Sequence, residues 1–429
     1  MTRIVVLGGG FAGMEVVQGL DRGLRGRDDV DVLLVSDRNY LLFTPLLPQV
    51  ASSMVEPRHI IQPIRDIRGF SGRFRFRRDS VIGVDLMARR VRLAEGDVEW
   101  DRLVLALGGV TPTFSVPGVE EHALPYKTLE DAMALRDHLL DLAEHADHDP
   151  GGPLRRPLTI CVVGGGYTGV ELIAELQDLF ASYIVPRYRG IGPSDYRLLL
   201  VEAGREILRG VHPALAARAR QQLWRERIEV HTDTRVTRVQ AGAIETAGGA
   251  RIPVSLTIWA AGVSGHPVLA RLPVRKDRLN RVVVDHFMRL PDHPGVYGAG
   301  DAVVVSEMPS ASIPIIPAAL AHGRVVADNL IAELNGRPLR AIDFEPRGML
   351  VSLGEKNAVV EVFGVRISGV FAWLFWNALH LLKLVGVRKQ IQVALDWSLA
   401  QLFPRDSAIM RRPARCPICR NLARAPDAA

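Results

Sequence analysis

The sequence predicts an α/β protein built on two parallel sheets, and two glycine-rich segments are the main reason. The first segment is RIVVLGGGFAG at residues 3–13, and the second is TICVVGGGYTG at residues 159–169. In each, an apolar run typical of a buried parallel strand precedes the glycines, and an apolar-periodic run typical of a helix follows them. The repeat of strand, turn and helix indicates two copies of one nucleotide-binding architecture, the Rossmann-like fold.

Each segment holds the spacing G-x-G-x-x-G, which allows a tight turn and a close approach of a pyrophosphate to the helix N-terminus. The residues of these two turns that we expect to contact a cofactor are Gly8, Gly10, Phe11, Ala12, Gly13, Gly164, Gly166, Tyr167, Thr168 and Gly169. Either run alone could be only a tight strand–helix turn. Two runs in matching contexts predict two bound dinucleotides, with electron transfer between them.

Composition narrows the class of protein. The chain has 429 residues, of which 48% are hydrophobic and 23% charged, so we expect a globular protein of two or three domains. The net charge of +6 is modest, and no basic patch interleaved with aromatics precedes the C-terminal tail, so a nucleic-acid partner is rejected. Three cysteines exclude a disulfide framework and favour a reducing compartment. The first predicted strand starts at Arg3, so we expect no signal peptide and a cytoplasmic protein.

The first nucleotide fold begins with a strand at 4–7, a helix at 13–22 and a second strand at 30–35. A buried strand at 103–107 follows and ends in a turn at Gly108, and residues 144–157 have the composition of a linker. The second fold has strands at 159–163, 197–201 and 256–259. Apolar segments after residue 280 resemble the first fold again, so we expect the second to be inserted into a discontinuous first. The predicted boundaries are 1–150 with 276–335, 151–275, a C-terminal region at 336–410, and a basic tail at 411–429.

Acidic residues suggest which dinucleotide each fold takes. Glu202 closes the second strand of the second fold, where a carboxylate holds the ribose hydroxyls and repels the 2′-phosphate of NADP, so NAD(H) is favoured. The equivalent positions in the first fold are Ser36 and Asp37. The segment GVYGAGDAV at 295–303 favours FAD there, because Gly300 and Asp301 place a carboxylate beside a ribityl or pyrophosphate-side hydroxyl. The alternative for Asp301 is an ordinary helix N-cap.

Several longer stretches resemble the type II NADH:quinone oxidoreductases, which are flavoproteins with two dinucleotide-binding domains. These stretches are RNYLLFTPLLPQVASSMVEPRHIIQPIR at 38–65, LVLALGGVTPTFSVPGVEEHALPYKTLEDA at 103–132, VVGGGYTGVELIAEL at 162–176, LTIWAAGV at 256–263 and AWLFWNALHLLKLVGVR at 372–388. The resemblance covers nearly all of residues 1–406. It implies FAD in the first fold, NADH in the second, and a peripheral, monotopic enzyme on the cytoplasmic face of the cell membrane that delivers electrons to a quinone without pumping protons.

The resemblance also implies roles for single residues. Thr44 and Pro45 would lie near the flavin ring, Lys127 would border the flavin site, and Glu171 would face the junction of nicotinamide and flavin. The alternative for Glu171 is a solvent-facing or capping glutamate in the first turn of a helix. The turn that includes Ala261 and Gly262 would let the nicotinamide half lie close to the backbone. We expect no metal site.

The implied reaction is hydride transfer from NADH to the flavin, followed by reduction of an acceptor. Disulfide reductases and sulfide:quinone reductases need cysteines near the flavin, and none is placed for that role. Cys161 lies in a predicted strand and is expected to serve packing. Two alternatives stay open, which are a flavin reductase for another small or protein acceptor and a redox-sensing flavoprotein without quinone turnover.

One segment departs from the family. Where relatives carry a helix start rich in glutamine that forms part of the quinone pocket, this chain reads IPIIPAALAHG at 313–323. Pro317 and Ala321 stand where glutamines are expected, which removes hydrogen-bond partners for a quinone carbonyl. His322 can replace them as a donor and proton source, because its unperturbed pKa is about 6.5. The alternative is a structural histidine.

The C-terminal region predicts two amphipathic helices. In 370–387 the polar residues Asn377, His380 and Lys383 fall along one side at helical spacing, and apolar residues recur at helical intervals over 391–402. Such helices suit insertion into one leaflet of an anionic membrane. A single transmembrane helix and a dimer-forming helix pair are the alternatives, and we expect a homodimer. Cys416 and Cys419 form a lone CxxC, which is expected to be incidental, with a regulatory disulfide or a shared metal as alternatives.

Overall fold

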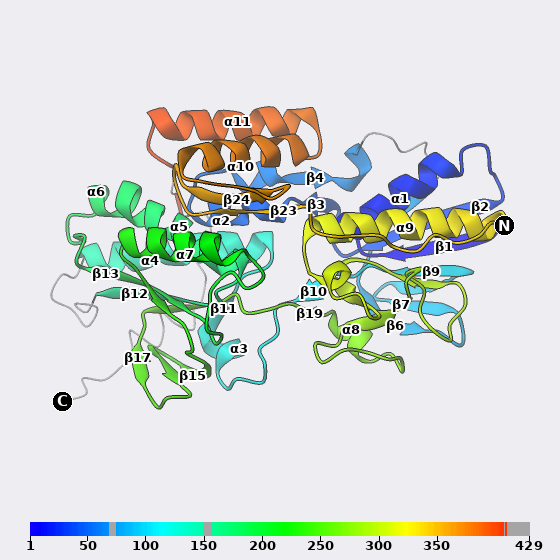
Figure 1. The fold of residues 1–429 in the computed structure, drawn as a ribbon, viewed down its shortest axis with the longest axis horizontal. Coiled ribbons are helices and arrows are strands. Elements are labelled where there is room, and N and C mark those ends of the chain that lie inside the picture. The colour runs from blue at the N-terminus through cyan, green and yellow to red at the C-terminus, as the bar shows by residue number, and fades with distance from the viewer. Residues whose placement is uncertain (68–73, 149–156, 407, 410–429) are drawn as a thin grey trace. The chain divides into compact units, whose positions relative to one another are not determined.

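The computed structural model describes residues 1–67, 74–148, 157–406 and 408–409 (Figure 1). These residues form two compact units, each assembled from separate pieces of the chain. Unit 1 takes in Met1–Leu42, Ile61–Val110 and Val263–Pro346, and unit 2 takes in Phe43–Ile60, Thr111–Gly262 and the described part of Arg347–Ala429. The chain passes between the units after residues 42, 60, 110, 262 and 346. The predicted boundaries of the four regions stay a prediction.

Unit 1 is built on a parallel sheet in the order β21-β9-β1-β2-β5 among the described residues. Its strands are β1 (Thr2–Leu7), β2 (Val30–Ser36), β5 (Phe74–Arg78), β9 (Arg102–Leu105) and β21 (Val296–Gly298). Strand β21 comes from beyond the second glycine segment, so the first nucleotide fold is discontinuous, as predicted. The apolar residues of β1 and β9 are fully buried, because helices cover this sheet.

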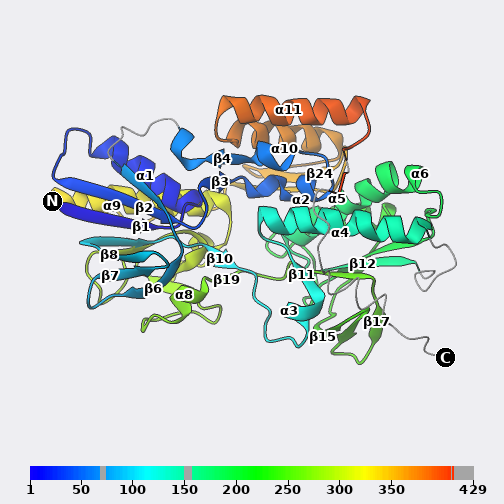
Figure 2. The same cartoon turned by 180° about the vertical axis from the view of Figure 1, so that it is seen from behind.

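Helices α1 (Phe11–Gly23) and α9 (Ile316–Leu334) lie side by side in both views (Figures 1 and 2). Small residues allow this close packing, since a Cβ on Gly19 would sit 2.5 Å from the Cβ of Ala327. The remaining elements of unit 1 are β3 (Tyr40–Leu42), β4 (Ile61–Pro63), β6 (Val81–Asp85), β7 (Arg90–Leu93), β8 (Gly96–Glu99), β10 (Gly109–Val110), β19 (Ser264–Gly265), α8 (Pro267–Ala270), β20 (Val282–Val284) and β22 (Val303–Val305).

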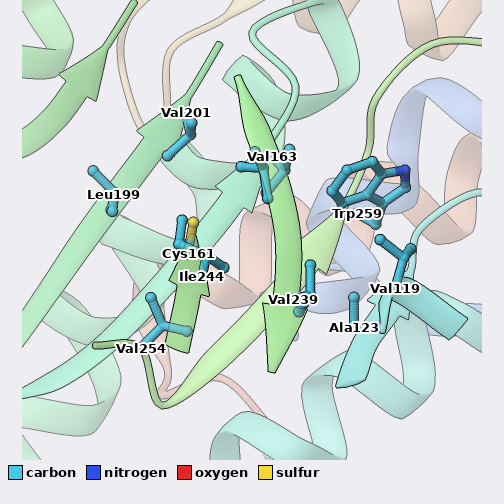
Figure 3. Close-up of a cluster of buried hydrophobic side chains, with 11 residues drawn as sticks. Val119, Ala123, Cys161, Val163, Leu199, Val201, Val239, Ile244, Val254 and Trp259 are labelled. Atoms are coloured by element: carbon cyan, nitrogen blue, oxygen red, sulfur yellow. The ribbon is translucent and has the colours of Figure 1, made fainter. Parts of the chain in front are cut away.

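Unit 2 holds a second parallel sheet, in the order β11-β18-β12-β13-β14 among the described residues. Its strands are β11 (Ala123–Pro125), β12 (Leu158–Val163), β13 (Tyr196–Val201), β14 (Ile228–His231) and β18 (Leu256–Trp259). Figure 3 shows one core cluster of this sheet, in which Cys161 and Trp259 are fully buried. Burial raises the pKa of the Cys161 thiol to about 12, so its predicted packing role is confirmed.

The other elements of unit 2 before its C-terminal part are α2 (Leu47–Ala51), α3 (Val119–His122), α4 (Leu129–His148), α5 (Tyr167–Leu179), α6 (Val185–Arg187), α7 (Pro213–Arg225), β15 (Val236–Gln240), β16 (Ala243–Thr246) and β17 (Arg251–Pro253). Helix α4 corrects one prediction, because residues 144–148 continue the helix instead of starting a linker. The first residue that breaks helices there is Pro150. Residues 149–156 lie outside the described part of the chain.

The C-terminal part of unit 2 is an antiparallel sheet followed by two helices. These elements are β23 (Gly348–Ser352), β24 (Ala358–Val362), β25 (Val365–Ser368), α10 (Val370–Lys383) and α11 (Val387–Leu402). Helices α10 and α11, in orange and red, run alongside each other in both views (Figures 1 and 2). No helix in the described part of the chain combines the length and apolar character that a bilayer crossing needs. The cysteine pair at 416 and 419 and the basic tail at 411–429 lie outside the described residues.

Candidate functional site

The two glycine turns have the same tightly closed backbone. Gly8 and Gly164 adopt φ angles of +110° and +118°, which L side chains rarely adopt. A Cβ on Gly13 would sit 1.9 Å from the carbonyl oxygen of Gly8, and a Cβ on Gly169 would sit 1.8 Å from that of Gly164. In each turn, therefore, only glycine lets the helix close against the strand that precedes it.

The middle glycine of each turn is different, because it faces open space. A Cβ on Gly10 or on Gly166 would meet no described atom within 4 Å. Each of these two residues is the N-cap of the helix that follows, and neither helix has a side-chain cap or an acidic first turn among the described residues. Both helix N-termini therefore keep room and unneutralised N–H dipoles for an anionic group such as a pyrophosphate.

Unit 1 brings the predicted flavin-side residues together. A Cβ on Gly300, whose φ is +70°, would lie 3.0 Å from the Cβ of Ala12, and a Cβ on Gly109 would lie 3.4 Å from that of Asp301. Gly108, at φ +69°, faces open space. The Gly300–Ala302 turn thus lies beside the start of α1, where its carboxylate can accompany a ligand held by the glycine turn.

His322 is buried in unit 1, with 2% of its surface exposed. Its Nδ1 accepts a hydrogen bond from the Gly300 N–H at 3.1 Å, so its Nε2, 2.8 Å from the Ala311 carbonyl oxygen, is the donor. Burial lowers the pKa of His322 to about 4. Because both nitrogens are engaged and the ring is neutral, the geometry favours the structural alternative, and the catalytic role of His322 stays a prediction that no contact supports.

The end of β2 offers a hydroxyl where other nucleotide folds offer a carboxylate. Ser36 is buried, and its Oγ accepts a hydrogen bond from the Arg38 N–H at 3.3 Å. A Cβ on Gly9 would lie 3.0 Å from this Oγ, so Ser36 borders the glycine turn. Asp37 is exposed. Ser36 is therefore placed to contact a ligand in this turn.

The second turn has the corresponding carboxylate. Glu202 follows β13, and its two carboxylate oxygens accept hydrogen bonds from the N–H groups of Gly165 and Gly204, each at 2.7 Å. One of these donors belongs to the glycine turn itself, so Glu202 lies at the mouth of that turn. This position suits an acceptor for ribose hydroxyls and opposes a 2′-phosphate.

The chain just after β18 also approaches the second glycine turn closely. A Cβ on Gly164 would lie 2.9 Å from the Cα of Ala261, and Gly262 adopts a φ of +72°. The Trp259 indole donates a hydrogen bond to the Pro112 carbonyl at 2.8 Å, which holds the end of β18 in place. The predicted residues Ala261 and Gly262 are thus brought beside the second glycine turn.

The remaining predicted residues lie elsewhere in unit 2. Thr44 and Pro45 form a half-buried single turn that leads into α2. The backbone N–H of Lys127 donates to the Asp131 carboxylate at 2.9 Å, at the start of α4. Lys127 follows Tyr126, whose ring is buried near the Glu171 and Glu175 carboxyls. The proximity of these residues to a flavin stays a prediction.

Glu171 does not face solvent or cap its helix. It is half-buried on α5, and one carboxylate oxygen accepts a hydrogen bond from the Ser352 N–H at 2.9 Å. Burial is the largest cause that raises the pKa of Glu171 to about 8, and the charge of Glu175 adds to it. A carboxyl group that titrates near neutral pH is suited to proton exchange with a substrate.

Two further carboxyl groups follow Glu171 on α5, and sequence reasoning missed both. Glu175 and Asp178 lie four and seven residues after it, on the same side of the helix. Burial raises the pKa of each. The signal was present in the sequence, since acidic residues at helical spacing interrupt an otherwise apolar helix.

Helix α10 packs an aromatic side against the rest of unit 2. The His380 ring lies 4.0 Å from that of Trp376 and 6.1 Å from that of Phe43, and burial lowers the pKa of His380 to about 4. His380 and Asn377, on the predicted polar side of the helix, are half-buried, and Lys383 at its end is exposed. The Phe43 ring covers His380, so this part of the polar side packs within unit 2.

Comparison with known proteins agrees with this geometry. The family model described as pyridine nucleotide-disulphide oxidoreductase matches residues 2–323, and the NDH2 C-terminal domain model matches residues 347–406. The chain belongs to the type II NADH:quinone oxidoreductase family. Its C-terminal sheet and helices are thus the family's own C-terminal domain, and the predicted family and fold class are confirmed.

Relatives and solved structures match along nearly the whole chain. Demethylphylloquinone reductase NdbB of Synechocystis is 30% identical, over 92% of this chain and 95% of that protein. Type II NADH:quinone oxidoreductase NdhA of Mycobacterium tuberculosis is 29% identical, over 93% and 87%. The structure of NDH2 from Plasmodium falciparum in complex with NADH matches with a TM-score of 0.84 and 19% identity, over 95% and 99% of the two chains.

Proposed function

We propose that this protein is an FAD-dependent NADH dehydrogenase that passes electrons to a membrane quinone. The observation that carries the proposal is the pair of glycine turns, because each is closed by its outer glycines and left open at its middle one. Membership of the type II family supports the choice of NADH and quinone. Glu202 supports NADH over NADPH, since a carboxylate at the mouth of the turn opposes a phosphate.

Each of the two glycine turns would hold one cofactor. The Gly8–Gly13 turn with Ser36, Gly108, Gly300 and Asp301 would hold FAD, and the Gly164–Gly169 turn with Glu202 would hold NADH. Bound flavin supplies the hydride-accepting chemistry, while the protein supplies orientation and electrostatics. Glu171 is the titratable group that we assign to proton exchange, because its pKa of about 8 lets it bind and release a proton near neutral pH.

The experiment is steady-state NADH oxidation by the flavin-loaded protein, with and without a ubiquinone or menaquinone analogue. Quinone-dependent turnover is the expected result. Turnover only with other acceptors would support a different reductase, and a reduced flavin that is not reoxidised would support a redox sensor. Gly166→Ala should lower turnover by blocking NADH. Gly248→Ala is the matched control, because it lies outside the turn and its Cβ would meet only the Thr246 Oγ1, at an ordinary contact distance of 3.9 Å.

We also propose peripheral docking of the C-terminal helices on the cytoplasmic face of an anionic membrane. The exposed apolar residues of α10 and α11 are Val370, Phe371, Leu374, Phe375, Leu382, Val387, Ile391, Leu395, Leu399 and Leu402. Such residues on adjacent helices, with Arg388 exposed beside them, suit burial at a lipid interface.

Vesicle sedimentation tests the docking proposal. Leu395→Ser with Leu399→Ser should reduce binding to anionic phosphatidylglycerol vesicles at least tenfold, whereas Ile82→Ser, an exposed apolar residue of unit 1, should not. Equal binding by both variants would contradict the proposal. That the protein forms a homodimer is likewise our proposal, which sedimentation velocity in detergent tests.

A further inference from the structure

Helix α11 is attached to the rest of unit 2 mainly by polar contacts. Val393 is its one buried residue. Hydrogen bonds join it to the segment 49–59, in which the Trp397 indole donates to the Gln49 Oε1 at 2.8 Å and the Asp396 carboxylate lies 2.5 Å from the His59 Nδ1. Gln390 of α11 also donates to the Leu384 carbonyl at 3.1 Å, after the end of α10. A helix held in this way depends on the geometry of its polar partners rather than on a large apolar core.

The chain beyond α11 returns one side chain to the interior. Phe403, Pro404 and Asp406 are exposed, but Arg405 has only 9% of its surface exposed. Its Nη1 donates a hydrogen bond to the Ser52 carbonyl oxygen at 3.0 Å. A buried arginine between exposed neighbours needs negative charge nearby to offset its lost hydration.

That negative charge lies on α5. The guanidinium of Arg405 lowers the pKa values of both Glu175 and Asp178, against the larger raising effect of burial, so it acts on both carboxyl groups. The Asp178 carboxylate also accepts a hydrogen bond from the Glu355 N–H at 2.6 Å. Arg405 is thus the cation that offsets one buried acid, Glu175, and one half-buried acid, Asp178.

Glu175 joins this cation to α11. Its Oε2 accepts a hydrogen bond from the Ser52 Oγ at 2.9 Å, and the Gln49 side chain also hydrogen-bonds to its carboxyl group. Gln49 in turn accepts from Trp397 of α11, and Ser52 accepts from Arg405. The contacts therefore form a closed network that runs from α11 through α2 to α5 and back to the chain just after α11.

We propose that Arg405 is a latch, a positioning residue that closes this network, fastens α11 over α2 and α5, and holds the Glu175 and Asp178 carboxyl groups in place. Because α5 begins at the second glycine turn, the latch ties the C-terminal helix to the helix that we assign to NADH. The proposal goes beyond the electron-transfer function, and it does not depend on which acceptor the protein uses.

Hydrogen exchange of the full-length protein, measured by mass spectrometry without lipid, tests the latch. In Arg405→Met, peptides from 387–402 should exchange about tenfold faster, while peptides from α1 and α9 keep the wild-type rate. Arg405→Lys should recover most of the protection, and Glu175→Gln should reproduce the loss. Arg388→Met, which removes an exposed arginine of α11 itself, should leave exchange unchanged.

A pH comparison separates a latch from general loss of stability. The charged and titratable groups that act on Glu175 and Asp178 are Arg405, Glu355, Glu171 and Tyr126. Without Arg405 the acids are tolerated only when protonated, so the ratio of variant to wild-type exchange should be several-fold larger at pH 8 than at pH 6. Adding Glu175→Gln to Arg405→Met should shrink this difference. Unchanged α11 exchange, an equal ratio at both pH values, or faster exchange throughout unit 2 would each overturn the latch. Arg405→Gln, which also removes the charge, supplies the same comparison should Arg405→Met not fold.

Discussion

The two glycine turns share a backbone but differ in the side chain that borders them. Beside the first turn, Gly9 meets the Ser36 hydroxyl, and beside the second, Gly165 meets the Glu202 carboxyl. The outer glycines repeat to within 0.1 Å in their distance to the carbonyl that they would strike, 1.9 Å and 1.8 Å. Close packing of the strand against the helix therefore requires glycine at the outer positions of both turns. The side chain that borders the turn differs between them, and it can determine which ligand binds.

The helices that follow the turns differ more. Helix α1 packs against α9 through small residues, such as Gly19 against Ala327. Helix α5 instead carries three carboxyl groups, and the charge of the buried Arg405 lowers the pKa of two of them, Glu175 and Asp178. Both helices pack through apolar residues, but on α5 burial also raises the pKa of three carboxyl groups.

The largest expected effect comes from adding a methyl group at the last glycine of each turn. In Gly13→Ala and Gly169→Ala the new Cβ would overlap a carbonyl oxygen, so each should lower the free energy of unfolding by about 3 kcal/mol, in the range for strong overpacking. Urea denaturation measures this, and Gly248→Ala should change it by less than about 0.5 kcal/mol. If one turn tolerated alanine and the other did not, the two turns would not be equivalent.

The next effect distinguishes α5 from α1 by pH. The pKa of Glu171 is about 8 in the folded protein against an ordinary 4.5, so the stability that it contributes is present below its unfolded value and is lost as pH rises through about 8. Between pH 5 and pH 8 this loss is about 4 kcal/mol at about 1.4 kcal/mol per pH unit, and partial exposure of the side chain reduces it, so from pH 5 to pH 9 the wild type should lose about 3 kcal/mol more unfolding free energy than Glu171→Gln. The measurement is the urea midpoint at each pH, and parallel curves for the two proteins would contradict it.

Much of the fold could be predicted from the sequence, because the signals were local. The strand–glycine–helix order gave β1 with α1 and β12 with α5, since buried strands and tight turns leave a pattern within a few residues. The return of β21 to the first sheet was inferred from its likeness to first-fold material. Tertiary assembly was not local, and so Phe43–Ile60 was not expected to group with the C-terminal helices.

The residues of the site likewise fall into those that a local sequence signal predicts and those that depend on distant contacts. Glycines and Glu202 could be predicted from spacing, because their roles follow from backbone geometry and strand order. Arg405 could not, because its partners on α5 are more than 200 residues away and nothing near it in sequence marks it as buried. The same reason explains His322, whose burial between Gly300 and Ala311 depends on contacts beyond its own helix.

A third effect tests which turn binds which cofactor, through substitutions at the middle glycine of each turn. Gly10→Ala and Gly166→Ala should both fold normally, since their Cβ atoms meet no described atom within 4 Å. A methyl group there would obstruct a pyrophosphate, so Gly10→Ala should lose flavin affinity at least tenfold, about 1.4 kcal/mol, and Gly166→Ala should lose NADH affinity by a similar factor. Flavin absorbance and NADH titration measure the two losses. Loss of flavin in Gly166→Ala, but not in Gly10→Ala, would reverse our assignment.

The smallest effect concerns the bordering side chains. Glu202→Gln removes the charge that opposes a 2′-phosphate but keeps an acceptor for the ribose and for the Gly165 N–H, so kcat/KM for NADPH should rise about fivefold while that for NADH changes little. Five-fold corresponds to about 1 kcal/mol, which is the size expected for one exposed like-charge contact and smaller than the loss of a whole subsite. Ser36→Ala is the matched change at the first turn, and it should alter flavin content without altering the preference for NADH. If Ser36→Ala moved that preference instead, the nucleotide that donates the hydride would bind at the first turn and not at the second.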